Sequence, residues 1–221
     1  MRSINQRYGS FLNLCNTILI IFLFIAGSLK AETKAILTFG DSLTQGYGLP
    51  AEEGFVPQMG AWLKKQGISA KMINAGVSGD TTTGGLARLD WTLAEPVDLI
   101  IVNLGSNDML RGLDPLLVYN NLNQIIDKLQ KRQIATLLIG HRAPLNYGAA
   151  YKQAFDGAFE KLAINYDVHF YPFFLKVLMG PDEVSPELQR YFQPDGLHPN
   201  ANGVAALVKD IGPYILRALS K

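Results

Sequence analysis

Residues 97–108 read VDLIIVNLGSND, and this stretch decides the fold class. The four consecutive apolar residues at 99–102 are typical of a strand that is buried on both faces of a parallel sheet. A polar, glycine-containing turn, GSND at 105–108, follows the apolar run. The rest of the chain is interpreted outward from this strand and turn.

Short apolar runs alternate with longer amphipathic ones on both sides of this stretch. Alternating strands and helices require parallel pairing with right-handed crossovers. The sequence therefore predicts an α/β fold, a three-layer αβα sandwich with a five-stranded parallel sheet, in a single domain at 32–221. We expect strands at 35–39, 69–74, 97–104, 134–139 and 168–171, and helices at 55–66, 82–93, 115–131, 149–165 and 201–219. The least regular segment, 173–193, is expected at the surface.

The composition excludes several classes of protein. Of the 221 residues, 48% are hydrophobic and 18% are charged, which is enough apolar material for one core and excludes a disordered chain. The 20 Lys and Arg residues nearly balance the 19 Asp and Glu residues. Because nucleic-acid binders carry a basic excess or stripe, we expect no nucleic-acid partner.

The first 31 residues have the order of a secretory signal peptide. Arg2 and Arg7 come first, an apolar run at 18–26 follows, and small and polar residues at 27–31 end the segment. The uninterrupted apolar run is shorter than the roughly 20 residues that span a bilayer. We expect cleavage after Ala31, export to the periplasm or the medium, and no membrane span afterwards. An uncleaved N-terminal anchor is the alternative.

Cleavage after Ala31 would remove Arg2, Arg7 and Lys30 and no acidic residue, so the remaining charge would be 17 − 19 = −2. The only cysteine, Cys15, lies before the apolar run, whereas a lipoprotein site would place it behind. The predicted domain then has no cysteine for a disulfide or a thiolate metal site.

Polar turns follow the predicted strands at the edge where a parallel sheet binds ligands, beyond the carboxyl ends. They are GDSLT at 40–44, GVSGD at 76–80 and GSND at 105–108. A further polar segment, DGLHPN at 195–200, comes near the end of the chain. We expect these four segments to meet at one site.

These segments supply the groups that a serine hydrolase needs. Ser42 is the candidate nucleophile, His198 the candidate base, and Asp195, three residues before it, the carboxylate that orients the ring. Taken singly, a serine in a turn is also a common helix cap, and Asp195 could merely cap its loop. The other histidines fit less well: His169 falls within a strand, and His141 follows a strand near the predicted site.

The same turns also supply candidate donors for an oxyanion. The backbone N–H groups of Ser42 and Gly79 and the side-chain amide of Asn107 are of the right kind, because glycine lets a substrate approach the backbone closely and an amide donates without changing charge. Taken singly, each of these three residues is common in turns. Together with the Asp195–His198 pair, they predict one active site.

At these residues the sequence resembles the SGNH, or GDSL, hydrolase family, whose motifs centre on a Ser, a Gly, an Asn and a His. They correspond to Ser42, Gly79, Asn107 and His198, with Asp195 completing the triad. The match spans the chain after residue 31 and is closest to the bacterial periplasmic thioesterase, lysophospholipase and arylesterase branch. The segments that carry it are NAGVSGDT at 74–81, GGLARL at 84–89, NDMLRG at 107–112 and PLNYG at 144–148.

The resemblance implies a flavodoxin-like sheet, acyl-enzyme chemistry, and no metal or cofactor. The sequence departs from that branch at Ser106, where a second glycine before the asparagine is usual. A hydroxymethyl group at this position could crowd the acyl group or add a hydrogen bond. We expect a small-molecule acyl ester, thioester or lysophospholipid as substrate. Four residues are predicted to flank the acyl pocket, namely Leu110, Arg111, Leu145 and Tyr147. A carbohydrate acetylesterase and a non-catalytic lipid-binding module are the alternatives.

Overall fold

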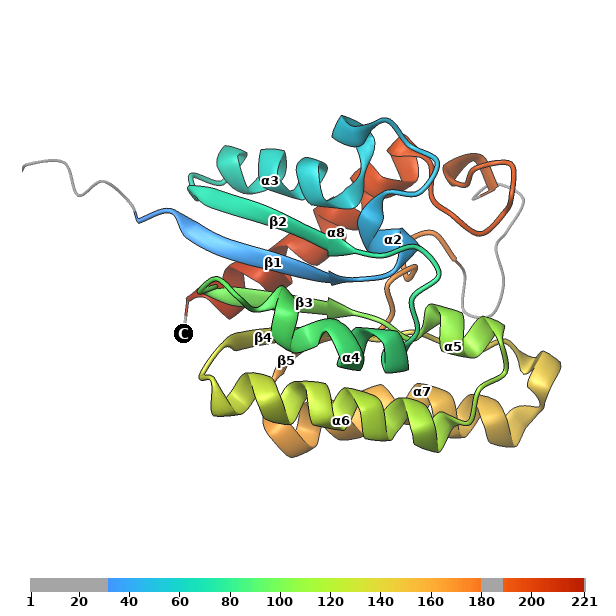
Figure 1. Ribbon diagram of the computed structural model, residues 1–221. Coiled ribbons are helices and arrows are strands. Elements are labelled where there is room, and N and C mark those ends of the chain that lie inside the picture. Colours follow the sequence, from blue (N-terminus) through green and yellow to red (C-terminus); the bar gives the residue numbers. More distant parts are fainter. Residues whose placement is uncertain (1–31, 180–188, 221) are drawn as a thin grey trace, which may run out of the picture. The chain divides into compact units, whose positions relative to one another are not determined.

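The computed structural model describes residues 32–179 and 189–220, which are built around a parallel β-sheet (Figure 1). Within these residues five strands pair in the order β2-β1-β3-β4-β5, and every pairing is parallel. This is the strand order of a flavodoxin-like sheet. The strands are β1 (Lys34–Gly40), β2 (Ala70–Gly76), β3 (Leu99–Asn103), β4 (Ala135–Ile139) and β5 (His169–Tyr171).

Helices cover both faces of the sheet, as Figure 1 shows. One hydrophobic cluster packs α3 (Phe55–Lys65) and α8 (Ala201–Leu219) against one face. A second cluster packs three helices against the other face, namely α4 (Thr82–Thr92), α6 (Pro115–Lys131) and α7 (Ala149–Tyr166). The predicted three-layer αβα sandwich is confirmed.

Strand β3 connects the two clusters. Leu99 and Ile101 belong to the cluster with α3 and α8, whereas Ile100 and Val102 belong to the cluster with α4, α6 and α7. Successive side chains of a strand point to opposite faces, so a strand between two helical layers must be apolar at every position. That is why this continuous apolar run predicts the fold class.

The predicted elements agree with the observed ones to within one or two residues at each end. Two short helices were not predicted, α2 (Ser42–Gln45) and α5 (Ser106–Leu110). Neither is long enough to show a helical period in its sequence. The other described elements are the 3₁₀ turns η1 (Ala51–Glu53), η2 (Leu145–Tyr147) and η3 (Gln189–Tyr191).

The short helices α2 and α5 mark the switch point of the sheet. Strand β1 pairs with β2 on one side and with β3 on the other, so the direction in which the chain adds strands reverses at β1. Gly40 at the end of β1 lies in register with Asn103 at the end of β3. In open α/β sheets this is where ligands bind, so residues 40–44 and 105–108 flank the expected crevice.

Two predictions fall outside the described residues. They are the signal peptide at 1–31 and the part of the irregular segment at 180–188. In the part of the chain that the structure describes, no helix is long and apolar enough to cross a membrane.

Candidate active site

Ser42 is the first residue of α2, and only Asp41 separates it from the end of β1 at Gly40. Asp41 caps this helix, because its Oδ1 accepts a hydrogen bond of 3.0 Å from the N–H of Leu43. Asp41 is completely buried, whereas Ser42 keeps 8% of its surface exposed and lines a pocket. The N–H groups of a helix's first turn have no acceptor inside the helix, so the N–H of Ser42 remains available to a ligand.

Asp195 and His198 lie in the loop that precedes α8. The Oδ1 atom of Asp195 accepts hydrogen bonds from the backbone N–H groups of Leu197 at 2.9 Å and His198 at 3.0 Å, and its Oδ2 lies 2.7 Å from Nδ1 of His198. Burial raises the pKa of Asp195, but the hydrogen bonds from the backbone and ring of His198 outweigh burial and lower this pKa to about 2. The carboxylate is therefore ionised at neutral pH.

The ring of His198 joins the carboxylate to the serine. Its Nε2 lies 2.9 Å from Oγ of Ser42, although the two residues are 156 positions apart in the sequence. Because Nδ1 donates to the ionised Asp195, the neutral ring presents Nε2 as an acceptor for the Ser42 hydroxyl. The ring of Tyr47 packs against the His198 ring with 4.7 Å between centroids. This arrangement can remove the serine proton.

Gly79 and Asn107 line the same pocket as Ser42 and His198. Gly79 has φ 80°, a left-handed conformation that favours glycine, and its carbonyl accepts a hydrogen bond of 2.8 Å from Nη2 of Arg111. Asn107 is the second residue of α5, and its side-chain amide makes no hydrogen bond to another described residue. Both residues can therefore donate to a substrate oxygen in the pocket.

The pocket that contains these residues has a volume of about 540 Å³. Its lining includes Ser42, Gly79, Asn107 and His198. Such a lining suits an apolar group that carries one reactive polar bond. The apolar lining comes from Leu43, Tyr47, Met109, Leu110, Ala143, Pro144, Phe173, Leu175, Met179, Phe192 and Leu197.

The four residues predicted to flank the acyl pocket take different places. Leu110 lines the pocket and is half-exposed. Arg111, Leu145 and Tyr147 do not belong to its lining. The guanidinium of Arg111 instead binds the carbonyl of Gly79, and the hydroxyl of Tyr147 donates to the carbonyl of Leu110 at 3.1 Å. These two side chains therefore support loops at the pocket, while Leu145 is exposed.

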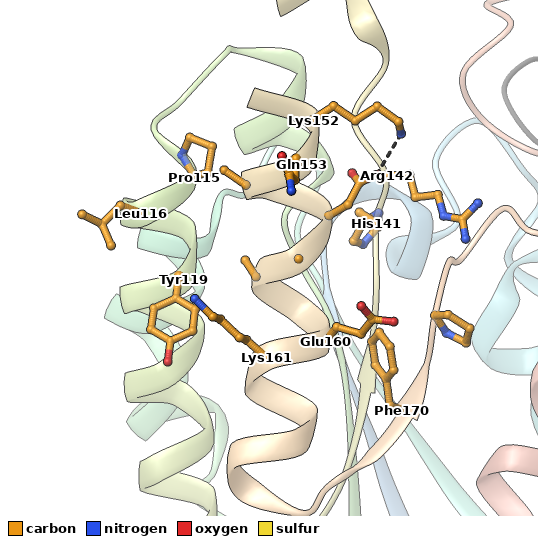
Figure 2. A pocket seen from close by; sticks show the side chains of 15 residues that line it. Pro115, Leu116, Tyr119, His141, Arg142, Lys152, Gln153, Glu160, Lys161 and Phe170 are labelled. Carbon is orange, nitrogen blue, oxygen red and sulfur yellow. Dashed lines mark hydrogen bonds and ion pairs between the residues drawn. The ribbon is translucent and has the colours of Figure 1, made fainter. Parts of the chain in front are cut away.

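A second, larger hollow of about 910 Å³ adjoins this pocket and extends over α7 (Figure 2). It shares His141, Arg142 and Lys152 with the pocket. The Nζ atom of Lys152 donates to the Ala143 carbonyl and pairs with Asp156, each at 2.8 Å. The lining of this hollow includes none of the candidate nucleophile, base and carboxylate residues, so the candidate active site is the smaller pocket.

Buried polar contacts beneath the site have no signal in the sequence. His141 is buried, lines the pocket, and lies with Nε2 3.1 Å from Oδ1 of Asn103. Burial lowers the pKa of His141 to about 4, so the ring is neutral and donates from Nε2. The Asn103 amide in turn donates to the hydroxyl of Thr44 in α2 at 3.2 Å. Ser106 donates a hydrogen bond to Asp41. These partners are 38 to 65 positions apart, so no local pattern connects them.

Comparison with known proteins identifies the family. A profile of the GDSL-like Lipase/Acylhydrolase family matches residues 38–206, a span that contains all the candidate site residues. The "Arylesterase" of Vibrio mimicus is 35% identical over 202 residues, which cover 91% of this chain and 97% of that protein. The "Thioesterase 1/protease 1/lysophospholipase L1" of Escherichia coli (strain K12) is 33% identical over 204 residues, which cover 91% and 88% respectively.

A solved structure agrees with these relatives. The crystal structure of AlinE4, described as an SGNH-hydrolase family esterase, is 44% identical to this chain and superposes with a TM-score of 0.69. The match covers 85% of this chain and 97% of AlinE4. From the family profile, the named esterase relatives and this shared fold, we conclude that the chain belongs to the GDSL-like lipase/acylhydrolase family and is a serine ester hydrolase.

Proposed function

We propose that this enzyme hydrolyses carboxylic esters and thioesters of fatty or aromatic acyl groups through a Ser42–His198–Asp195 triad. One observation carries the proposal. An unbroken hydrogen-bonded chain runs from Asp195 through His198 to Ser42, with atom separations of 2.7 and 2.9 Å, and ends in an apolar pocket.

The reaction begins when Nε2 of His198 takes the proton of Ser42 as Oγ attacks the substrate carbonyl carbon. The N–H groups of Ser42 and Gly79 and the amide of Asn107 donate hydrogen bonds to the oxyanion that forms. When the tetrahedral intermediate collapses, His198 gives its proton to the leaving alcohol or thiol. A water molecule that His198 deprotonates then hydrolyses the acyl-Ser42 ester, and the enzyme is restored.

The pocket supports the choice of acyl group. Phe173, Leu175 and Met179 supply an apolar wall, and Leu110 and Leu197 are half-exposed apolar residues in its lining. Burying the apolar surface of an acyl chain there stabilises its complex, by about 0.8 kcal/mol for each CH₂ group removed from water. The relatives named arylesterase and thioesterase/lysophospholipase support aromatic esters, thioesters and lysophospholipids as candidate substrates.

A chain-length series tests the proposal. We expect the purified enzyme to hydrolyse p-nitrophenyl esters between acetate and palmitate, and the Ser42→Ala variant to lose about 10⁴-fold or more in kcat. Ser69→Ala, at the opposite end of the sheet before β2, is the matched control. Selective hydrolysis of acetylated polysaccharide would favour an acetylesterase instead. A wild-type enzyme as inert as Ser42→Ala on all of these esters would favour a binding module.

We also propose that residues 1–31 are a signal peptide and that the enzyme is exported. The support is the sequence order of two arginines, an apolar run and a small-residue end at Ala31. Expressed at full length in a Gram-negative host, the protein is expected in the periplasmic fraction with the mass of residues 32–221. A full-length mass in the membrane fraction would indicate a retained anchor.

A further inference from the structure

One buried hydrogen bond joins the two halves of the proposed active site. Ser106 begins α5 and directly precedes Asn107, the proposed oxyanion donor. Asp41 directly precedes Ser42, the proposed nucleophile. The hydroxyl of Ser106 donates to Oδ2 of Asp41, and both residues are buried. The hydroxyl is thus directed at a carboxylate, even though Ser106 lines the acyl pocket.

Both oxygens of the Asp41 carboxylate accept hydrogen bonds. Oδ1 accepts from the N–H of Leu43 and Oδ2 from Ser106. A carboxylate that is ionised is an acceptor at both oxygens, whereas a carboxylic acid carries a proton on one of them. The hydrogen bond from the Ser106 hydroxyl to Oδ2 belongs to the ionised form, whereas a proton on Oδ2 would make the carboxyl group the donor and the Ser106 oxygen the acceptor.

The charged groups around Asp41 do not by themselves hold it ionised. It forms no salt bridge with another described residue. Asp80 opposes its ionisation and His198 favours it, while Arg88 is engaged with Asp80 at 2.7 Å and with the Gly40 carbonyl at 2.9 Å. Burial raises the pKa of Asp41 to about 6, and the hydrogen bonds from Ser106 and Leu43 act against this rise.

We propose that Ser106 is a positioning residue whose hydroxyl keeps the Asp41 carboxylate ionised and thereby fixes α2, with Ser42, against α5, with Asn107. The inference rests on the proposed function, in which Ser42 and Asn107 act on the same carbonyl group. The ionised Asp41 has a second effect, because its negative charge stabilises the positive charge that His198 gains in the transition state. Protonation of Asp41 removes this negative charge and reverses the hydrogen bond with Ser106, so it lowers kcat more than it changes KM.

The test compares Ser106→Ala with the wild type in kcat between pH 5.5 and 8.5, with released p-nitrophenol measured after an alkaline quench. A hydrogen bond to a charged group is strong enough to shift a pKa by about one unit. We therefore expect the ratio of wild-type to Ser106→Ala kcat to be about fivefold larger at pH 6 than at pH 8.5, where Asp41 is ionised in both enzymes and only the loss of the contact between α2 and α5 remains. Ionisations of other groups that affect both enzymes equally cancel in the ratio of the two kcat values.

Asp41→Asn provides an independent test with the opposite trend. Its amide cannot ionise, so the ratio of wild-type to Asp41→Asn kcat is expected to rise with pH, as Asp41 ionises in the wild type. Ser106→Ala added to Asp41→Asn is expected to cause no further pH-dependent loss, because the two residues act as one unit. The matched control is Thr136→Val, which also removes a buried hydroxyl. This hydroxyl lies away from the pocket and donates a hydrogen bond of 3.1 Å to the Ile134 carbonyl.

The possible outcomes separate this inference from the proposed function. An equal loss at every pH in Ser106→Ala, or the same pH-dependent loss in the Asp41→Asn background, overturns the inference. If Ser106→Ala does not fold, a pH-independent ratio for Asp41→Asn overturns it equally. If Ser42→Ala remains active, the proposed function fails. If Ser42→Ala is inactive and the Ser106→Ala ratio is flat, only the inference fails.

Discussion

Among single residues, Asn107 gives the sharpest test of the proposed mechanism. Its amide lines the pocket and makes no hydrogen bond to any other described residue, so it is available to a substrate oxygen. We expect Asn107→Ala to lower kcat roughly 10²- to 10³-fold. KM is expected to change little, because the amide binds the developing oxyanion more strongly than the neutral carbonyl.

Steady-state kinetics with a short-chain p-nitrophenyl ester measure both constants for Asn107→Ala. The matched control is Asn146→Ala, because Asn146 is an exposed asparagine of η2 outside the pocket lining. If Asn107→Ala kept the wild-type kcat, this amide would not be a donor to the oxyanion. A rise in KM at constant kcat would assign Asn107 to ground-state binding instead.

At the scale of elements, the contact between β2 and α2 positions Ser42, the proposed nucleophile. Gly76 ends β2 against α2, and a Cβ atom there would meet the backbone N of Gln45, its Cα at 2.7 Å and the Asp41 carbonyl oxygen at 2.9 Å. Because these are backbone atoms, α2 would have to move to admit a methyl group. We expect Gly76→Ala to lower the free energy of unfolding by about 1–3 kcal/mol and to lower kcat, since Ser42 moves with α2.

Urea unfolding and kcat measure the two effects of Gly76→Ala. The matched control is Gly157→Ala in α7, where a Cβ atom would meet nothing within 4 Å. That substitution is expected to raise the free energy of unfolding by about 0.5–1 kcal/mol, because it restricts the unfolded chain and favours the helix, and to leave kcat unchanged. An unaltered urea midpoint and kcat in Gly76→Ala would show that α2 tolerates displacement.

For the whole molecule, two buried groups make stability depend on pH in opposite directions. Burial raises the pKa of Asp41 from 3.8 to about 6 and lowers that of His141 from 6.5 to about 4. The folded protein holds the Asp41 proton more tightly than the unfolded chain. The contribution of Asp41 to the free energy of unfolding is therefore present below pH 3.8 and is lost as the pH rises through 6. The His141 contribution is present above pH 6.5 and is lost as the pH falls through 4.

Each contribution is about 3 kcal/mol, so the two changes largely cancel between pH 4 and 6. We expect Asp41→Asn to lose stability relative to the wild type as the pH falls through this range, because only the His141 contribution remains. His141→Gln is expected to gain stability relative to the wild type over the same range. Urea unfolding at pH 4.5, 5.5 and 6.5 measures these differences, and values that do not change with pH would contradict both assignments.

The sequence by itself determined the fold class and the local half of the site. The apolar run at 99–102 predicted a strand between two layers, because alternating side chains must be buried on both faces. The pairing of Asp195 with His198 was predictable as well, since three residues bring a carboxylate within reach of a ring in the same loop.

Tertiary structure decided the contacts that join distant segments. Whether the Ser106 side chain crowds the pocket or binds a partner depends on its orientation, and only the packing of α5 beside α2 turns its hydroxyl toward Asp41. The short helices α2 and α5 and the buried His141 follow from the same packing. Their sequences carry no period, and their hydrogen-bond partners become neighbours only when the ends of β1, β3 and β4 meet at one edge of the sheet.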